Sequence, residues 1–353
     1  MPSFASAPGK VILFGEHAVV YDKLGVSVAA GPKRSRVSVR PSGGCYVLDS
    51  EQYGRREKTA AEIAEDMKTL ESLRQRGEYK EIKEISKRDK LLASFAVVYE
   101  AVKKYGSRVR PFEARIDCDI PKNLGSSASV FVSLVHAVSN EFGLNMTGEE
   151  IGDLANLGDM VAHGRASGID THTVVKGGWN TYLKSRSPKV LPLEAELEQG
   201  ILVVSSGDSA RTLDTVSYLG RLHERKKDGV DRIMERLDGI SKAGMRAVLE
   251  RDAAGVGRLM YDYYEELRKV DSIESDAGDK IDFETAKMRE IVKLSRGFEA
   301  LGAKPTGGWG GGCVIILGDA KNLQEKFADA GFENSFVAEL GCEGVREGVN
   351  PSF

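Results

Sequence analysis

Residues 112–142, FEARIDCDIPKNLGSSASVFVSLVHAVSNEF, contain the stretch that decides the fold. The segment 112–120 predicts a strand that ends at Pro121, and the apolar run from Val130 to Phe142 predicts a helix. Between them lies the turn PKNLGSSAS, which is rich in serine and contains Gly125. A strand, a short turn and a helix therefore follow one another without a long loop.

This turn has two interpretations. A helix N-terminus offers free N–H donors and the positive end of the helix dipole. A glycine lets a phosphate approach the backbone, and a serine hydroxyl can reach a bound Mg²⁺. The plainer alternative is a serine that only caps the helix. The P-loop pattern G-x-x-x-x-G-K-[ST] is absent from the sequence.

The first forty residues predict strands. KVILF (10–14) and GVSVAA (25–30) are apolar runs, and RVSVR (36–40) alternates apolar with polar residues. Lys10 is either an ordinary exposed lysine or a fixed cation directed at an active site. Glu16 and His17 follow the first run, where a turn would expose them, although a lone histidine is most often structural.

Helical and strand patterns are mixed along the rest of the chain. Capping boxes open two helices, at Thr59 and Thr147. Helical patterns follow these boxes and recur at 91–105, 213–271 and 282–302, strands are expected at 201–205 and 313–317, and 164–178 is expected to be a loop leading into a strand. Because strands and helices do not alternate strictly, the predicted class is α+β.

Two prolines, Pro188 and Pro192, lie between patterned regions and predict a domain boundary near residue 190. We therefore expect two domains, 1–190 and 191–353. A chain of 353 residues is long enough for both. The charged stretch 75–90 is expected to be a solvated surface, because acidic residues interleave the basic ones.

Composition excludes several classes of protein. The 50 Lys and Arg residues nearly balance the 53 Asp and Glu residues, so the net charge of −3 gives no general attraction to nucleic acid or to a membrane. No apolar run is long enough for a transmembrane helix, and the N-terminal residues do not resemble a signal peptide. The cysteines, at 45, 118, 313 and 342, are scattered without a CxxC pair. Free thiols in the cytoplasm are therefore expected.

Two further patterns contain candidate functional residues. Asp159 stands eleven residues before Asp170, and such carboxylates could divide the work, one holding Mg²⁺ and the other accepting a proton. The alternative is a surface aspartate and a turn aspartate. The glycine cluster 307–312, GGWGGG, is either a flexible loop or a second backbone surface around a phosphate or a reacting oxygen.

In this order, the segments resemble the motifs of the GHMP kinase superfamily. The resemblance extends from Ala7 to about Leu317. Within the superfamily, the chain is most like the mevalonate kinases, in the segments APGKVILFGEHAVVYDKLGVSVAA (7–30), HGRASGIDTHTVVKGG (163–178) and GAKPTGGWGGGCVIIL (302–317). It implies a two-domain α+β fold. The N-terminal domain would be like domain 2 of ribosomal protein S5 and the C-terminal domain ferredoxin-like, with ATP and substrate meeting between them.

The resemblance also implies roles for individual residues. Asp170 would be the catalytic aspartate, with Lys10 beside it. Ser127 and Asp159 would hold Mg²⁺. The phosphate-binding loop would be Pro121, Lys122, Asn123, Leu124, Gly125, Ser126 and Ser127. The substrate side would comprise Glu16, His17, Thr212, Gly310 and Gly311. His17 and Arg165 are the two candidates for binding the substrate carboxylate.

The chain departs from the family pattern in four places. The phosphate loop usually reads PxGxGLGSSA, whereas PKNLGSSA is two residues shorter and lacks the first two glycines, for which we expect Lys122 to compensate. Asp159 replaces a glutamate, so a water could bridge it to the metal. Trp309 interrupts the glycine run, and Arg165-Ala166 replaces the usual residues before SGID.

The implied activity is ATP- and Mg²⁺-dependent phosphorylation of the C5 hydroxyl of mevalonate by a cytoplasmic enzyme that could form a homodimer, with no nucleic-acid or membrane partner. The nearest alternative is phosphomevalonate kinase, since GAKP also occurs in that group. Another small-alcohol kinase of the superfamily and a non-catalytic homologue that senses a ligand are further alternatives, although Lys10 and Asp170 are both retained. A dinucleotide-dependent dehydrogenase is disfavoured, because no G-x-G-x-x-G follows the first strand.

Overall fold

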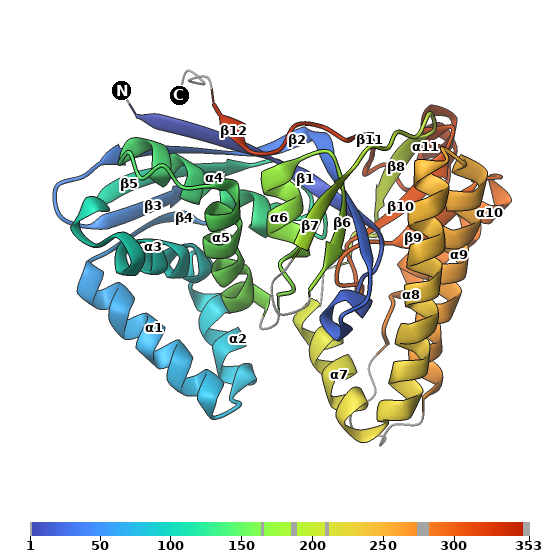
Figure 1. Cartoon of the computed structure of the whole chain (residues 1–353), viewed down its shortest axis with the longest axis horizontal. Coiled ribbons are helices and arrows are strands. Elements are labelled where there is room, and N and C mark those ends of the chain that lie inside the picture. The colour runs from blue at the N-terminus through green and yellow to red at the C-terminus, as the bar shows by residue number, and fades with distance from the viewer. Residues whose placement is uncertain (1, 164–165, 185–188, 209–211, 274–281, 349–353) are drawn as a thin grey trace.

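The fold is described from a computed structural model that covers residues 2–163, 166–184, 189–208, 212–273 and 282–348 (Figure 1). A mixed sheet runs through the molecule in the order β4-β3-β5-β2-β11-β8-β10-β9. The strands are β1 (Ser3–Phe14), β2 (Gly25–Pro41), β3 (Tyr46–Ser50), β4 (Gly54–Lys58), β5 (Phe112–Cys118), β6 (Trp179–Leu183), β7 (Lys189–Leu193), β8 (Gly200–Ser205), β9 (Gly302–Pro305), β10 (Cys313–Gly318), β11 (Ser335–Leu340) and β12 (Arg346–Glu347).

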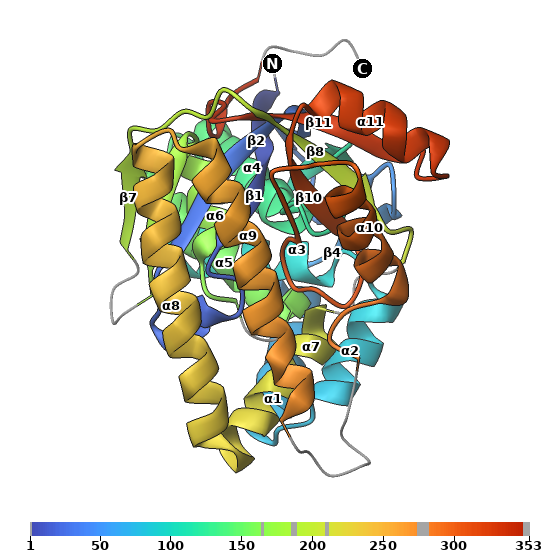
Figure 2. The ribbon, with the colours of Figure 1, turned by 90° about the vertical axis from the view of Figure 1, so that its right-hand side faces the viewer.

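Helices cover the sheet in both halves of the molecule. They are α1 (Ala60–Gln75), α2 (Tyr79–Arg88), α3 (Leu92–Tyr105), α4 (Ser126–Glu141), α5 (Gly148–His163), α6 (Ile169–Lys176), α7 (Thr212–Arg225), α8 (Lys227–Leu249), α9 (Ala253–Arg268), α10 (Ala286–Gly297) and α11 (Ala320–Asp329). In the N-terminal half α4 packs on β1 and β2. In the other half α8 and α9 lie side by side, and α9 and α10 contact β9 (Figure 2).

Two strand pairings join the halves. The end of β11 pairs with β2 at Gly31 while its other residues pair with β8. The short β12 returns to pair with β1 at Ala5 and Ser6. The chain is therefore α+β as predicted, with one apolar core under each set of helices. The domain boundary near residue 190 stays a prediction.

Local signals in the sequence explain most elements. The capping box at Thr59 opens α1, where the Thr59 side chain accepts from the Glu62 N–H and the Glu62 carboxylate accepts from the Thr59 N–H. Gly106 ends α3 with a positive φ, as predicted. The first strands are longer than the apolar runs alone indicate, because β1 and β2 pair along almost their whole length.

The expectation for the segment that contains Asp170 was wrong. Residues 164–178 were expected to form a loop into a strand, but α6 occupies 169–176 and the strand β6 begins only at Trp179. The β-branched run TVV in this segment favours a strand locally. Burial of Ile169, Thr171 and Val174 against the neighbouring elements overrides that preference.

Candidate active site

Lys10 and Asp170 come together at the centre of the molecule. The Lys10 side chain on β1 is buried, and its Nζ lies 3.0 Å from Oδ1 of Asp170 in the first turn of α6. The pairing of β1 with β2 shifts register between Pro8 and Gly9, immediately before Lys10. Such irregularities re-aim the side chains that follow them. This pair was predicted from the sequence.

The segment before Asp170 is held by the neighbouring strand. Gly168 has a left-handed φ of 93° and begins α6. The hydroxyl of Tyr182 on β6 donates to the carbonyl of Ser167. Burial, and then the charge of Asp170, raise the pKa of Tyr182 well above its usual value, so the phenol stays a donor. Tyr182 therefore fixes the turn from which Asp170 projects.

The predicted phosphate loop leads directly into α4. Gly125 is the residue before the helix and has a left-handed φ of 78°. A Cβ atom built on Gly125 would lie 2.9 Å from Cγ of Lys10, so only glycine lets Lys10 pass. The N–H groups of the first turn of α4 have no intrahelical acceptors and are available to an anion.

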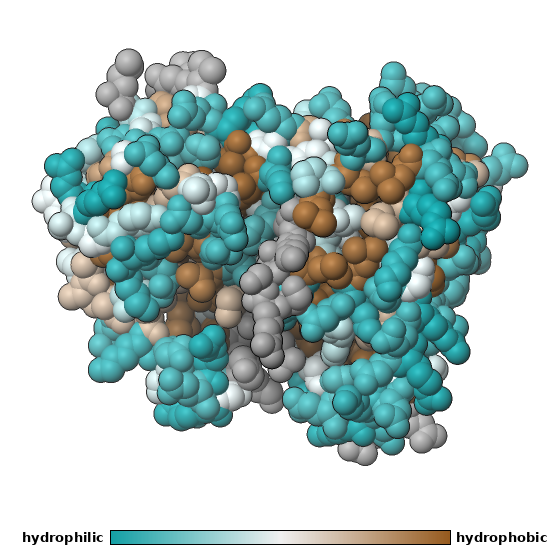
Figure 3. Space-filling model, in the orientation of Figure 1, coloured by the Kyte–Doolittle hydropathy of each residue, from teal (hydrophilic) through white to brown (hydrophobic). Residues whose placement is uncertain are grey.

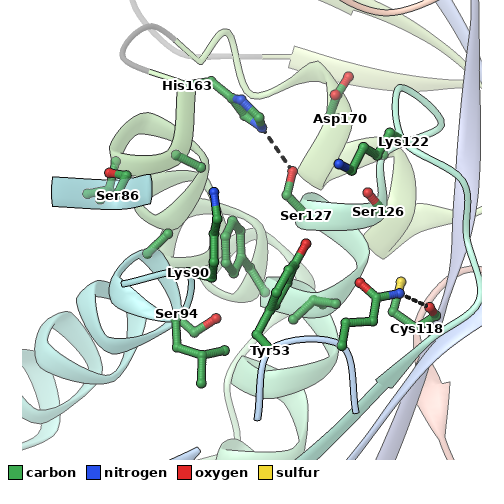
Figure 4. Close-up of a pocket in the computed structure, with 18 of the residues that line it drawn as sticks. Tyr53, Ser86, Lys90, Ser94, Cys118, Lys122, Ser126, Ser127, His163 and Asp170 are labelled. Carbon is green, nitrogen blue, oxygen red and sulfur yellow. Dashed lines mark hydrogen bonds between the residues drawn. The ribbon is translucent and has the colours of Figure 1, made fainter. Parts of the chain in front are cut away.

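Ser127, Asp159 and His163 form a polar cluster beside this turn. The Ser127 hydroxyl donates to Oδ1 of Asp159 at 2.8 Å, and Nε2 of His163 lies 3.1 Å from the same hydroxyl (Figure 4). Asp159 is buried, which raises the pKa of its carboxyl; His163 opposes that shift, whereas the charge of Asp170 adds to it. His163 was not predicted, although it begins the quoted segment HGRASGID.

These oxygens fit a magnesium ion. Mg²⁺ usually takes one or two carboxylates together with substrate phosphates and water, rather than a closed protein cage. Asp159 is a buried carboxylate that a cation would stabilise, and Ser127 supplies a neutral oxygen next to it. Within the residues that the structure describes, no group of three or more His, Cys, Asp or Glu side chains forms such a cage.

A pocket of about 530 Å³ opens above the phosphate loop and extends away from Asp170. Its far end is lined by residues that the sequence reasoning did not name as site residues, and two of them, Ser86 and Lys90, lie in the stretch 75–90 that was expected to be a solvated surface. They are Tyr53, Ser86, Lys90, Ser94 and Cys118 (Figure 4). The Ser86 hydroxyl is buried without a hydrogen-bond partner. This volume suits a nucleotide-sized ligand.

The substrate-side candidates Glu16 and His17 were expected to be exposed by a turn, but both are buried. Glu16 forms an ion pair with Lys304, whose side chain is fully buried on β9. Burial lowers the pKa of His17 to about 4, although a hydrogen bond with the backbone of Gly308 acts in the opposite direction. His17 is therefore neutral near pH 7. His17 therefore does not supply a cation for the substrate carboxylate. This corrects the expectation for His17, which with Arg165 was one of two candidates for that role.

The glycine cluster 307–312 packs against the phosphate loop. The carbonyl of Gly311 accepts a hydrogen bond from Nδ2 of Asn123, and the N–H of Gly310 donates to the carbonyl of Phe283 at 3.1 Å. Substrate contacts of these glycines stay a prediction. The Thr212 side chain and Arg165 lie outside the part of the chain that the structure describes.

Hydrophilic residues cover much of the face in Figure 3. Among the helices of the described residues, none is long and apolar enough to cross a membrane.

Comparisons with known proteins show which family the chain resembles. The family described as GHMP kinases N terminal domain matches residues 93–178, which include the phosphate loop and Asp170. Mevalonate kinase from Archaeoglobus fulgidus is 32% identical, covering 97% of this chain and 98% of its own, and that from Thermococcus gammatolerans is 30% identical, covering 98% of each. The crystal structure of Methanococcus jannaschii mevalonate kinase has a TM-score of 0.73 at 23% identity, covering 96% of this chain and 98% of its own.

The fold and the site thus define a small-molecule kinase of the GHMP class. Within that class, the chain belongs to the mevalonate kinase family.

Proposed function

We propose that this chain transfers the γ-phosphoryl group of ATP to the C5 hydroxyl of mevalonate. The observation that carries the proposal is the Lys10–Asp170 pair, which lies beside the N-terminus of α4 and the pocket above it. The full-length similarity to mevalonate kinases supports the choice of acceptor.

Asp170 orients the acceptor hydroxyl and takes its proton as the oxygen bonds to the γ-phosphorus and the bond to ADP breaks. Lys10 fixes the carboxylate and stabilises negative charge on the transferring group. The N–H groups of the α4 N-terminus and Lys122, which lines the pocket, bind the phosphates. Positioning and electrostatics supply most of the catalysis in phosphoryl transfer.

Ser127 and Asp159 are the residues that would hold Mg²⁺. The ion would neutralise charge on the phosphate oxygens. The short side chain of Asp159 leaves room for a bridging water, which Mg²⁺ readily retains.

The far end of the pocket accommodates the base and ribose of ATP. Tyr53, in the turn between β3 and β4, offers an aromatic face, and Ser86 offers a buried, unpartnered hydroxyl. Lys90 places a cation at the same end. The turn between β3 and β4 and residues 82–90 thus form one wall of the nucleotide site.

Neutral His17 offers a ring nitrogen rather than a charge. Its Nε2 is buried without a hydrogen-bond partner, while the ring packs 4.8 Å from that of Phe283, measured between ring centroids. The ion pair with Lys304 fixes Glu16 and, through it, the position of the adjacent His17. We propose that Nε2 accepts from a hydroxyl of the substrate and that another group binds its carboxylate.

The test compares two acceptors in one assay. ADP release from Mg-ATP is measured with mevalonate and with 5-phosphomevalonate, using Asp170→Asn as the background control. Turnover with mevalonate alone supports the proposal. Activity only with 5-phosphomevalonate would move the chain to the next phosphorylation, and ATP binding without turnover of either would overturn the choice of acceptor.

A cytoplasmic location and a homodimer are further proposals. All four cysteines are free thiols in the structure, as suits a reducing compartment. Light scattering on the purified chain tests the homodimer.

A further inference from the structure

The phosphate loop of this chain is short, and it is Asn123 that connects it to the glycine cluster. Nδ2 of Asn123 donates to the carbonyl of Gly311 across the join between the two halves of the molecule. Asn123 has a φ of 71°, in the left-handed region that a non-glycine residue adopts at a cost and that asparagine tolerates best. This backbone conformation turns the Asn123 side chain toward the glycine cluster.

The glycine cluster is shaped around this residue. A Cβ atom on Gly307 would lie 2.9 Å from the carbonyl oxygen of Asn123, and one on Gly312 would overlap its side-chain amide. Both glycines have left-handed φ values, 79° and 104°. The thiol of Cys313 lies 3.5 Å from the carbonyl oxygen of Lys122, as a weak donor. Contact with the phosphate loop, and not only with a ligand, therefore requires glycine at these positions.

The other side of the phosphate loop is held by β1. The Lys10 N–H donates to the carbonyl of Leu124 at 2.8 Å, and the Lys10 side chain runs against Gly125. The glycine cluster in turn is tied to α7, since the hydroxyl of Thr215 donates to the carbonyl of Gly308 at 2.6 Å. The loop is thus clamped between the first strand and the glycine cluster.

We propose that Asn123 is a positioning residue that locks the shortened phosphate loop onto the glycine cluster and so presets the loop for the triphosphate. A loop with more glycines can wrap a phosphate with its own backbone. This loop lacks that freedom, and Asn123 supplies rigidity instead, so less ordering entropy is lost when ATP binds. The inference rests on the proposed function, because it assumes that the ligand is ATP.

The first test is Asn123→Gly, which removes the side chain without adding backbone strain. The matched control is Asn145→Gly, because Asn145 is an exposed asparagine with a φ of 53° in the loop between α4 and α5. Isothermal titration calorimetry measures ATP binding without acceptor, and thermal unfolding measures stability. We expect Asn123→Gly to weaken ATP binding by about 3- to 10-fold, as for the loss of one hydrogen bond. Asn145→Gly should leave it unchanged.

The second test is a double-mutant cycle with Gly312→Ala. The added Cβ collides with the Asn123 amide, so Gly312→Ala should weaken ATP binding much more in the native background than in the Asn123→Gly background. The strain from the positive φ of residue 312 is the same in both and cancels.

Each outcome of these tests has a distinct meaning. Equal ATP affinity of the native chain and Asn123→Gly, or additive effects in the cycle, overturns the inference. A lower melting temperature with unchanged ATP affinity would show that Asn123 is merely structural. If the native chain binds ATP but does not phosphorylate mevalonate, only the proposed acceptor fails; if it binds no ATP, both proposals fail.

Discussion

Lys10 and Asp170 form an unequal ion pair: the lysine side chain is 1% exposed, whereas the aspartate is 31% exposed. The cation is fixed by β1 and by the phosphate loop that packs on it. The carboxylate remains open toward the pocket, which both residues line. An accessible carboxylate that a buried cation orients can accept a proton from a hydroxyl group in the pocket.

Asp170→Asn should therefore lower kcat by at least about 100-fold, because positioned general bases contribute on the order of 10²–10⁴-fold. ATP affinity should change by less than about 2-fold, since the amide keeps the shape of the carboxylate. Steady-state turnover and calorimetry measure the two quantities. Asp153→Asn is the control, since this exposed aspartate on α5 pairs with His172 on α6 and is not among the residues that line the pocket. Near-normal turnover of the Asp170 variant would remove the residue from its role.

Asp159→Ala should raise the Mg²⁺ concentration needed for half-maximal turnover by roughly 10-fold or more. The variant removes the buried carboxylate that accepts from Ser127, so the remaining hydroxyl is a weak ligand alone. A Mg²⁺ titration at fixed ATP concentration is the measurement. Asp153→Ala on the same helix should titrate like the native chain, and an unchanged curve for Asp159→Ala would mean that the metal binds elsewhere.

The residues near Asp170 show how far the sequence could lead. Lys10, Ser127, Asp159 and Asp170 could be named because each stands in a short motif that resembles one of the GHMP kinase motifs, whereas their residue types and spacing alone left alternatives open. The motifs could not show which groups face one another across the chain. The ion pair between Glu16 and Lys304 joins residues 288 positions apart, and no local pattern links them.

Other parts of the site were missed for physical reasons. Tyr53 lies in the turn between β3 and β4 and Ser86 lies on α2, and only the folded chain brings these two segments to the wall of one pocket. The sequence shows that Trp309 interrupts a glycine run. It does not show that this residue is fully buried and has a φ of 55°. Its ring stacks with Tyr264, so tertiary packing offsets the left-handed backbone.

Lys304→Met should destabilise the fold by about 3–5 kcal/mol, because it leaves Glu16 buried without its cation. Burial already raises the pKa of Glu16 and lowers that of Lys304, each against the pull of the other. The double variant Glu16→Gln with Lys304→Met should recover a large part of the loss. Urea unfolding of the two single variants and the double variant gives the coupling free energy. Additive losses would show that the pair is not a coupled unit.

His17 makes the fold sensitive to acid. Its pKa is about 4 in the folded chain, chiefly because of burial, against about 6.5 when unfolded. Between these values the unfolded chain binds a proton that the folded chain does not, so the stability due to neutral His17 is complete above about pH 6.5 and is lost as the pH falls toward 4. The difference corresponds to about 3 kcal/mol.

His17→Gln cannot titrate, so its free energy of unfolding should fall less steeply than that of the native chain across this window. His136 and His172, whose pKa values burial also lowers, are present in both proteins and cancel in the comparison. Parallel pH profiles for the two proteins would show that folding does not lower the pKa of His17 and would contradict the prediction.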